Sequence, residues 1–350
     1  MNIHALLQTC TESGASDLHL SAGEPARLRM NGDLNMVSDV SWTDDDIRAA
    51  LTVLMTSVQL EMLKQTLACD FAYQAANSSR FRVNVFHQHR GLAAVFRVVL
   101  GSVPTLDELH APLILTELAK SKRGLVLVTG PTGSGKSTTI AAMIDLLNRT
   151  TAKHVLTIED PIEFVHTPRQ CLINQREVGI HALSFADALR SGMREDPDVI
   201  LVGELRDLDT MRLAMTAAET GHLVFATLHT TSAAKTMDRI IDVFPAQEKD
   251  MIRNMLSESL TAVISQVLCK RKDVGRIAAY EILVATPAIR NLIREGKVAQ
   301  MYSLMQTGIA SGMQTLDQSL MALSRQGLID VESAKEMAKF PESIHLAIAG

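Results

Sequence analysis

The residues best suited to do chemistry form one glycine-rich run. Gly130 to Ser137 fills every fixed position of the pattern G-x-x-x-x-G-K-[ST], directly after the apolar run Leu125–Val128. In such a loop, backbone N–H groups curl around phosphates, Lys136 reaches the β- and γ-phosphates, and the Ser137 hydroxyl binds Mg²⁺. The pattern therefore predicts a site for ATP and Mg²⁺. The residues predicted to hold the nucleotide are Gly130, Pro131, Thr132, Gly133, Ser134, Gly135, Lys136, Ser137 and Thr138, with Ser137 as the metal ligand.

Buried strands alternating with helices must position this loop. The predicted strands are 125–128, 154–158, 199–202 and 222–228, and the predicted helices between them are 138–147, 184–193 and 207–219. Apolar strands separated by helices indicate a parallel sheet covered on both faces, whose ligands bind beyond the carboxyl ends of the strands. Five polar residues follow these strands and are candidates to meet the nucleotide: Glu159, Asp160, Glu163, Glu204 and His229.

Glu204 is the first candidate for catalysis. It follows the apolar run Val199–Val202 and Gly203, and Gly203 stands where the Asp of a standard Walker B strand would be. A carboxylate at this place can order Mg²⁺ or polarise the attacking water. The structural alternative is a salt bridge from Glu204 to Arg206 or Arg194.

The acidic run Glu159–Glu163 and two histidines offer further candidates. Pro161 forces a turn that holds these acids outward. Two roles are possible for the run. Either Glu163 or Glu159 completes the metal and water site, or the run is a solvated turn with a helix cap. His229 lies at a carboxyl end of a strand, where its imidazole can hydrogen-bond a γ-phosphate. His222 lies seven residues earlier, and its role stays open between packing and sensing.

The first hundred residues show a different pattern, of short alternating strands and caps. Strands are predicted at 17–20, 26–30, 34–37, 81–86 and 93–98, with a hairpin turn at Asn31–Asp33 and a helix at 45–54. This indicates a small α+β domain. The predicted division is an N-terminal domain at 1–100, a linker at 101–115, an ATPase core at 116–280 and a C-terminal helical region at 281–350.

Composition sets the outer bounds on function. The 350 residues are 47% hydrophobic and 21% charged with a net charge of −5, which is typical of a globular protein and gives no bulk basic footprint for nucleic acid. The four cysteines are far apart in sequence, so we expect core thiols in a reducing compartment. No apolar run approaches the roughly 18 residues of a membrane span, so we expect a cytoplasmic protein.

One C-terminal segment is a clear helix. Thr286 is a predicted N-cap with Pro287 at the first helical position, and Ile289, Leu292 and Ile293 form an apolar stripe. Periodicity alone predicts only a surface helix docked by that stripe.

Taken together, the motifs resemble those of the type IV pilus retraction ATPases, a branch of the secretion-ATPase superfamily, over nearly the whole chain. The matching stretches are Ala15–Leu20 (the N-terminal signature), Gly130–Ser137 (Walker A), Thr157–Phe164 (the Asp box), Asp196–Glu204 (an atypical Walker B), Gly221–His229 (the His box) and Ala288–Glu295 (AIRNLIRE).

The resemblance implies a RecA-like P-loop ATPase domain with a smaller N-terminal α+β domain of PAS-like fold, assembled as a homohexamer. It implies that Glu204 is the catalytic glutamate and that Glu163 supports the metal and water. It also implies that a neighbouring subunit supplies Arg80, Arg82 and Arg97 to the phosphates, as trans-acting cations that stabilise transition-state charge.

The implied function is ATP-driven pilus retraction at the cytoplasmic side of the inner membrane, at the pilus base. The implied partners are an inner-membrane platform protein and an accessory retraction ATPase. Three alternatives stay open. An extension ATPase would be longer and carry a four-cysteine zinc motif, a DNA-translocating or type IV secretion ATPase would lack AIRNLIRE, and a regulatory module would bind ATP but hydrolyse little of it.

Overall fold

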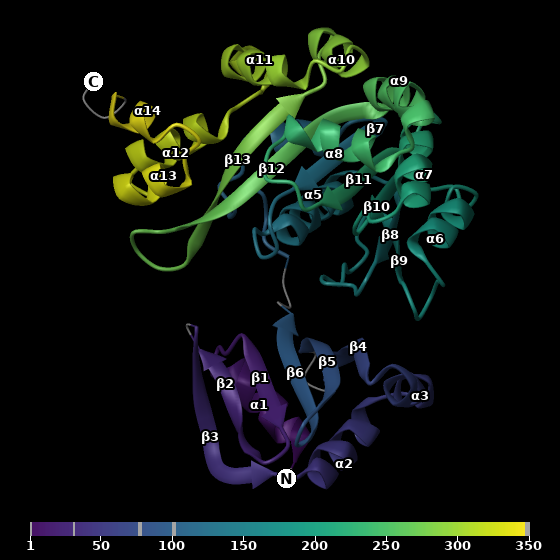
Figure 1. Cartoon of the computed structure of the whole chain (residues 1–350), viewed down its shortest axis with the longest axis vertical. Coiled ribbons are helices and arrows are strands. Elements are labelled where there is room, and N and C mark those ends of the chain that lie inside the picture. Colours follow the sequence, from purple (N-terminus) through teal and green to yellow (C-terminus); the bar gives the residue numbers. More distant parts are fainter. Residues whose placement is uncertain (1, 31, 76–78, 100–102, 347–350) are drawn as a thin grey trace. The chain divides into compact units, whose positions relative to one another are not determined.

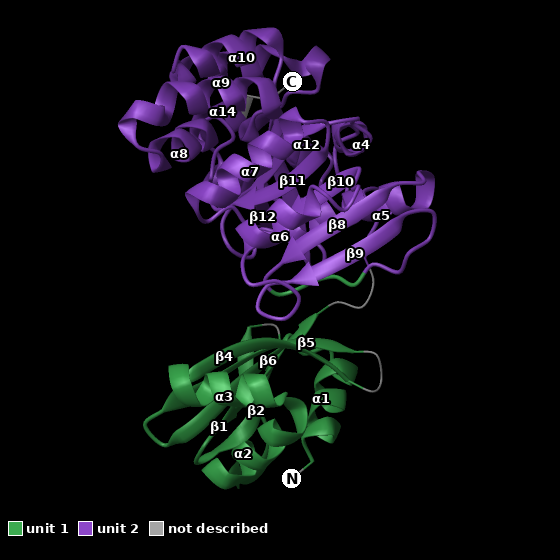
Figure 2. Cartoon of the chain, turned by 90° about the vertical axis from the view of Figure 1, so that its right-hand side faces the viewer, with its two compact units in different colours: residues 1–102, 161–165 green, residues 103–160, 166–350 purple. Residues whose placement is uncertain are grey.

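The computed structural model describes residues 2–30, 32–75, 79–99 and 103–346. The chain divides into two compact units, which Figure 2 shows in different colours. Unit 1 contains residues 1–102 and 161–165, and unit 2 contains residues 103–160 and 166–350. The four-part division made from the sequence stays a prediction.

In its described residues, unit 1 is an antiparallel sheet with three helices. Its strands have the order β3-β2-β1-β6-β5-β4. Its elements are α1 (Ile3–Glu12), β1 (Asp17–Ser21), β2 (Glu24–Met30), β3 (Asp33–Trp42), α2 (Asp44–Leu54), α3 (Ser57–Thr66), β4 (Ala68–Gln74), β5 (Arg80–Gln88) and β6 (Gly91–Val99). The predicted pairing of β2 with β3 is confirmed, while Asn31 of the predicted turn lies outside the described residues. The predicted helix start is also confirmed, because Thr43 and Asp46 form a capping box.

The described part of unit 2 is built on a sheet of seven strands in the order β13-β12-β7-β11-β10-β8-β9. The strands are β7 (Gly124–Thr129), β8 (His154–Glu159), β9 (Leu172–Glu177), β10 (Val199–Val202), β11 (Leu223–Leu228), β12 (Leu260–Lys270) and β13 (Arg276–Val284). All neighbours pair in parallel except β12 and β13, which form an antiparallel hairpin. The four predicted strands and their parallel pairing are therefore confirmed.

One boundary of these strands was predicted wrongly. His222 lies just before β11 instead of within it, because Gly221 adopts a φ of 120° and the His222 N–H bonds the carbonyl of Ala217. The backbone thus turns back to the end of α7 before the strand begins.

Helices cover both faces of the unit 2 sheet. The helices of this unit are α4 (Ile114–Ala119), α5 (Lys136–Thr150), α6 (Phe185–Gly192), α7 (Leu208–Glu219), α8 (Lys235–Val243), α9 (Lys249–Ser259), α10 (Pro287–Arg294), α11 (Met301–Thr307), α12 (Leu316–Arg325), α13 (Val331–Met337) and α14 (Pro341–Leu346), with short 3₁₀ turns η1 (Ala246–Glu248), η2 (Val298–Gln300) and η3 (Ile309–Ser311).

Alternate residues of β7 enter different cores: Leu125 and Leu127 pack with α6 to α10, whereas Val126 and Val128 pack with α4 and α5. The β7 strand is thus held rigidly from both sides, directly before the loop.

The last three helices pack on the hairpin of β12 and β13. Cys269 and Ile277, near the turn of the hairpin, share a core cluster with Leu320 of α12 and Ile344 of α14 (Figure 1). The C-terminal stretch up to 346 is thus docked, and 347–350 lies outside the described residues. Among the helices of the described residues, none has the length and apolar character needed to cross a membrane.

Candidate active site

The glycine-rich loop connects β7 to the first turn of α5. Gly130 and Gly135 have φ values of 142° and 88°, which only glycine adopts without strain. A Cβ at Gly130 would also lie 2.3 Å from the carbonyl oxygen of Gln266 on β12. The N-terminus of α5 has no side-chain cap, so the N–H groups of its first turn lack an intrahelical acceptor and face the loop. This is the geometry of a phosphate site.

Lys136 begins α5 and lies inside the loop. It is only 8% exposed, and its ammonium donates to the carbonyls of Gly130 (2.8 Å) and Pro131 (3.0 Å). The same Nζ lies 3.5 Å from Nδ1 of His229. The cation is therefore fixed where phosphate oxygens would bind.

The donors present fit a nucleotide phosphate. Besides the lysine and the open helix terminus, the buried Oγ of Ser134 has no hydrogen-bond partner among the described residues. The described residues contain no cluster of three or more His, Cys, Asp or Glu side chains able to hold a metal. Mg²⁺ usually keeps several waters and binds through one or two protein oxygens and substrate phosphates, so the hydroxyl of Ser137 in the first turn of α5 fits this ion without such a cluster.

Glu204 lies just beyond β10 and is held at both oxygens. One oxygen is 2.8 Å from Nη2 of Arg206, and the other is 3.0 Å from Nε2 of His229. Burial by itself raises the pKa of Glu204, but Arg206 and His229 together hold this pKa below its ordinary value. The carboxylate is therefore charged at neutral pH. The salt bridge to Arg206, posed as an alternative to catalysis, exists together with the contact to His229.

The backbone around Glu204 is fixed by its neighbouring strands. The Gly203 N–H donates to the carbonyl of Ile158 (2.7 Å), and the Leu205 N–H donates to the carbonyl of Thr227 (3.0 Å). A Cβ at Gly203 would lie 3.1 Å from the Ile158 oxygen, so a glycine at this position permits close packing against β8. The position of Glu204 thus follows from the sheet itself.

The structure brings Lys136, His229 and Glu204 into one contact chain, in which His229 touches the other two. It does not bring His222 to this place. The Nδ1 of His222 lies 2.9 Å from the carbonyl of Ala217, at the opposite end of β11.

The acidic run after β8 divides between the units. Glu159 ends β8, and one of its oxygens accepts from Thr157 (2.6 Å) and Gln175 (3.2 Å). Glu163 belongs to unit 1, where its carboxylate lies 3.9 Å from Nη1 of Arg82.

The three predicted arginines lie on neighbouring strands of unit 1. Arg80 and Arg82 alternate with buried residues along β5, and Arg82 pairs directly with Arg97 of β6. Arg97 also contacts Asp17 at 2.8 Å. Arg80, Arg82 and Arg97 thus form a cationic patch on one part of the sheet.

Gln266 supports the loop and was not predicted from the sequence. Its Nε2 donates to the carbonyl of Ser134 at 2.5 Å, across 132 residues of sequence. The local signal for it is an amide inside the largely apolar strand β12, since buried polar side chains are normally hydrogen-bonded.

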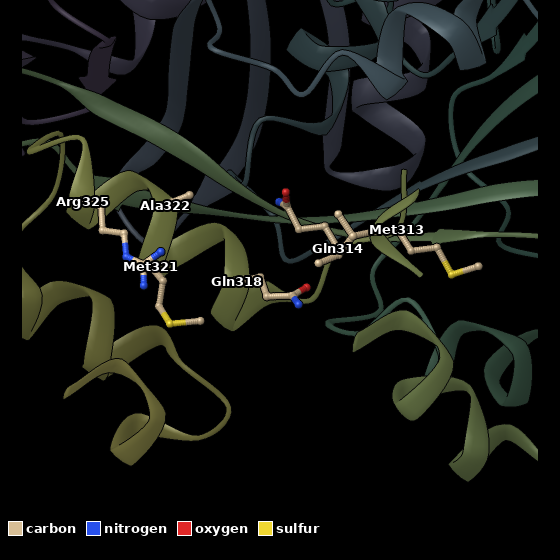
Figure 3. Close-up of a pocket in the computed structure, with 7 residues that line it drawn as sticks. Met313, Gln314, Gln318, Met321, Ala322 and Arg325 are labelled. Atoms are coloured by element: carbon tan, nitrogen blue, oxygen red, sulfur yellow. The ribbon is translucent and has the colours of Figure 1, made fainter. Parts of the chain in front are cut away.

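A separate pocket of about 240 Å³ lies between η3 and α12 (Figure 3). It is lined by Ile309, Met313, Gln314, Gln318, Met321, Ala322 and Arg325. None of these lining residues belongs to the glycine-rich loop or to the contact chain of Lys136, His229 and Glu204.

The parallel sheet, the glycine-rich loop and the acid beyond β10 define a RecA-like P-loop ATPase. The sequence pattern of the "Type II/IV secretion system protein" family matches residues 1–274. The chain therefore belongs to the Type II/IV secretion system protein family.

Three known proteins show how near the likeness is. The chain is 57% identical over 343 residues to the "Type IV pilus retractation ATPase PilT" of Pseudomonas aeruginosa, covering 98% of this chain and 100% of that protein. It is 58% identical over 318 residues to the "Twitching motility protein" of Neisseria gonorrhoeae, covering 91% and 85%. Among solved structures, that of the "Pilus Retraction Motor PilT and Bound ADP" matches with a TM-score of 0.91 at 45% identity, covering 99% of both chains.

Proposed function

We propose that this chain is an ATP-hydrolysing motor that powers the retraction of type IV pili. The observation that carries the proposal is the contact chain of Lys136, His229 and Glu204 beside an open phosphate loop. It occurs in a chain 57% identical to a protein named as a retraction ATPase.

Each residue of the contact chain has a distinct task. Lys136 exchanges the carbonyls of Gly130 and Pro131 for phosphate oxygens when ATP binds. Ser137 would hold Mg²⁺, which would neutralise negative charge on the bound phosphates. Glu204, kept ionised by Arg206 and His229, orients the attacking water. His229 contacts both Glu204 and Lys136, and its imidazole hydrogen-bonds the γ-phosphate of bound ATP.

We further propose that the active unit is a homohexameric ring with ATP bound between subunits. Arg80, Arg82 and Arg97 of a neighbouring subunit then approach the phosphates, and Glu163 supports the metal and water. A cationic patch brought to the site by domain closure stabilises transition-state charge and makes hydrolysis depend on that closure. Closure in turn moves the part at 1–100 against the ATPase core at 116–280, with 101–115 as the linker and 281–350 as the helical region that carries AIRNLIRE.

The proposed place of action is the cytoplasmic face of the inner membrane at the pilus base. The motion would be transmitted to a platform protein in that membrane, and an accessory retraction ATPase of the same family could act with this chain. No nucleic acid takes part.

Purified protein tests the proposal. Mg²⁺-dependent ATP hydrolysis that is lost in Glu204→Gln, while nucleotide binding persists, supports the motor. Glu195→Gln, which alters an exposed glutamate just before β10, is the matched control and should retain turnover. Absence of turnover in the unaltered protein would contradict the motor and favour a regulatory module that binds ATP without hydrolysing it.

A further inference from the structure

The segment that carries His229 is anchored by a buried acid on the far edge of the sheet. Residues 229–234 connect β11 to α8, and α8 begins without a side-chain cap. In place of a cap, the N–H of Ala233 donates to Oε1 of Glu281 on β13 at 2.6 Å. Glu281 is only 6% exposed, and the Ser232 hydroxyl is a second hydrogen-bond partner. A carboxylate at this end of α8 also interacts favourably with the positive end of the helix dipole.

Hydrogen bonds within the anchored segment hold it together. The hydroxyls of Thr230 and Thr236 lie 2.7 Å apart, and the Thr236 hydroxyl donates to the carbonyl of Ser232 at 2.8 Å. These contacts tie the segment to the first turn of α8. A shift of Ala233 is therefore passed to His229, four residues earlier, which contacts Glu204 and Lys136.

The hairpin of β12 and β13 holds both sides of the site. Gln266 of β12 fixes the glycine-rich loop through the carbonyl of Ser134, and Glu281 of β13 fixes the segment after β11. In the register of the hairpin, Glu281 lies opposite Ser265, the neighbour of Gln266. One rigid ribbon thus sets the distance between the phosphate loop and His229.

Burying a carboxylate at position 281 costs free energy, which indicates that Glu281 has a role there. Burial raises the pKa of Glu281, and the Asp317 carboxylate of α12 acts in the same direction, against the hydrogen bonds from Ala233 and Ser232 and the charge of Lys339. An apolar residue on this apolar strand would avoid that cost but would leave the Ala233 N–H without its acceptor.

We propose that Glu281 is a positioning residue for ATP hydrolysis, which holds His229 against Glu204 and Lys136 through the Ala233 N–H. The inference rests on the proposed ATPase function. It does not make Glu281 a catalytic residue, because Glu281 acts only through the segment that it anchors.

Three substitutions of Glu281 separate its hydrogen bond from its charge. Glu281→Gln keeps the acceptor oxygen at the same reach, Glu281→Asp keeps the charge but withdraws the oxygen by one methylene, and Glu281→Ala removes both. Because a small displacement at a catalytic site is costly, we expect Asp and Ala to lower kcat by roughly tenfold to a hundredfold with KM for ATP nearly unchanged, and Gln to restore most of the rate.

The matched control is Asp198→Asn. Asp198 also accepts from a backbone N–H, that of His154 at 2.8 Å, and it lies just before β10, at the strand end opposite to Glu204. It should leave kcat close to that of the unaltered protein. Hydrogen exchange gives a second readout: peptides covering residues 229–236 should exchange faster in Glu281→Asp and Glu281→Ala only.

The outcomes are separable from those for the proposed function. If the unaltered protein hydrolyses no ATP, the proposed function fails. If it hydrolyses ATP and Glu281→Asp and Glu281→Ala keep the full kcat, or if Asp198→Asn loses as much as they do, the positioning role is overturned. If Glu281→Ala does not fold, Glu281→Asp and Glu281→Gln still decide between the two results.

Discussion

The two sheets of the molecule present their polar residues in different ways. In unit 2 both faces of the sheet are covered by helices, and Lys136, Glu204 and His229 meet one another beyond the strand ends. In unit 1 one strand alternates buried and exposed residues, so Arg80 and Arg82 lie along β5 itself. The ends of parallel strands bring polar side chains together at one place, whereas a strand face distributes charged side chains along a surface. The first arrangement suits holding a nucleotide, and the second suits approaching one held elsewhere.

The strongest test of the unit 2 arrangement is Lys136→Ala. Because the ammonium lies at the centre of the phosphate loop, its loss should lower ATP turnover by roughly a hundredfold or more and weaken nucleotide binding as well. Turnover and fluorescent-nucleotide titration measure the two effects. The exposed Lys122→Ala is the control. Full nucleotide affinity in Lys136→Ala would contradict the assignment of the loop.

The unit 1 arrangement predicts a different signature for Arg82→Ala. Trans-acting arginines contribute to the transition state, so turnover should fall by about a hundredfold or more while nucleotide affinity is retained. Arg90→Ala is the control, because Arg90 pairs with Glu24 at the surface.

Mixing the two variants tests whether the arginines of one subunit act on the nucleotide of another. In a mixed ring, Lys136→Ala subunits still supply arginines to the intact loops of Arg82→Ala subunits, so the mixture should regain part of the turnover that each variant lacks. A mixture as inactive as its components would argue against arginines acting between subunits.

A smaller effect is expected within unit 2 from Arg206→Gln. The pKa of Glu204 is held below its ordinary value, so the carboxylate stays charged as the pH falls and loses its charge only when the pH reaches this lowered pKa. Removing Arg206 raises this pKa. The acidic limb of the turnover profile should then move to higher pH, whereas Arg194→Gln, at an exposed arginine before β10, should leave it in place. An unmoved limb would mean that Arg206 does not tune Glu204.

The smallest effect on turnover is expected at the AIRNLIRE helix. Arg294 lies 3.4 Å from Oε1 of Glu258 and 3.4 Å from Oγ of Ser257, both at the end of α9. Arg294→Ala should leave ATP binding and turnover nearly unchanged but reduce the force of retraction, measured on single pili. Loss of ATP binding in this variant would contradict the separation of the helix from the nucleotide site.

The sequence predicted those parts of the molecule that depend on local patterns. Strands β7, β8, β10 and β11 were apolar runs bounded by helices, and the glycine-rich loop is a contiguous motif. Strand β9 was missed because its residues Asn174, Gln175 and Arg176 are polar, and its burial comes from pairing at the sheet edge.

The supporting contacts of the site were beyond sequence reasoning for a physical reason. Gln266 and Glu281 act on loops 132 and 48 residues away, and only the sheet order β13-β12-β7-β11 brings them there. Their one local signal is a polar residue inside an apolar strand, which marks a buried hydrogen bond without naming its partner.

Whether ATP hydrolysis at Glu204 drives retraction is tested most directly in cells whose native copy is replaced by Glu204→Gln. Twitching motility and the amount of surface pili are measured together. We expect motility to be lost while pili accumulate on the surface. Normal motility with an ordinary number of pili would show that hydrolysis at this site does not power retraction.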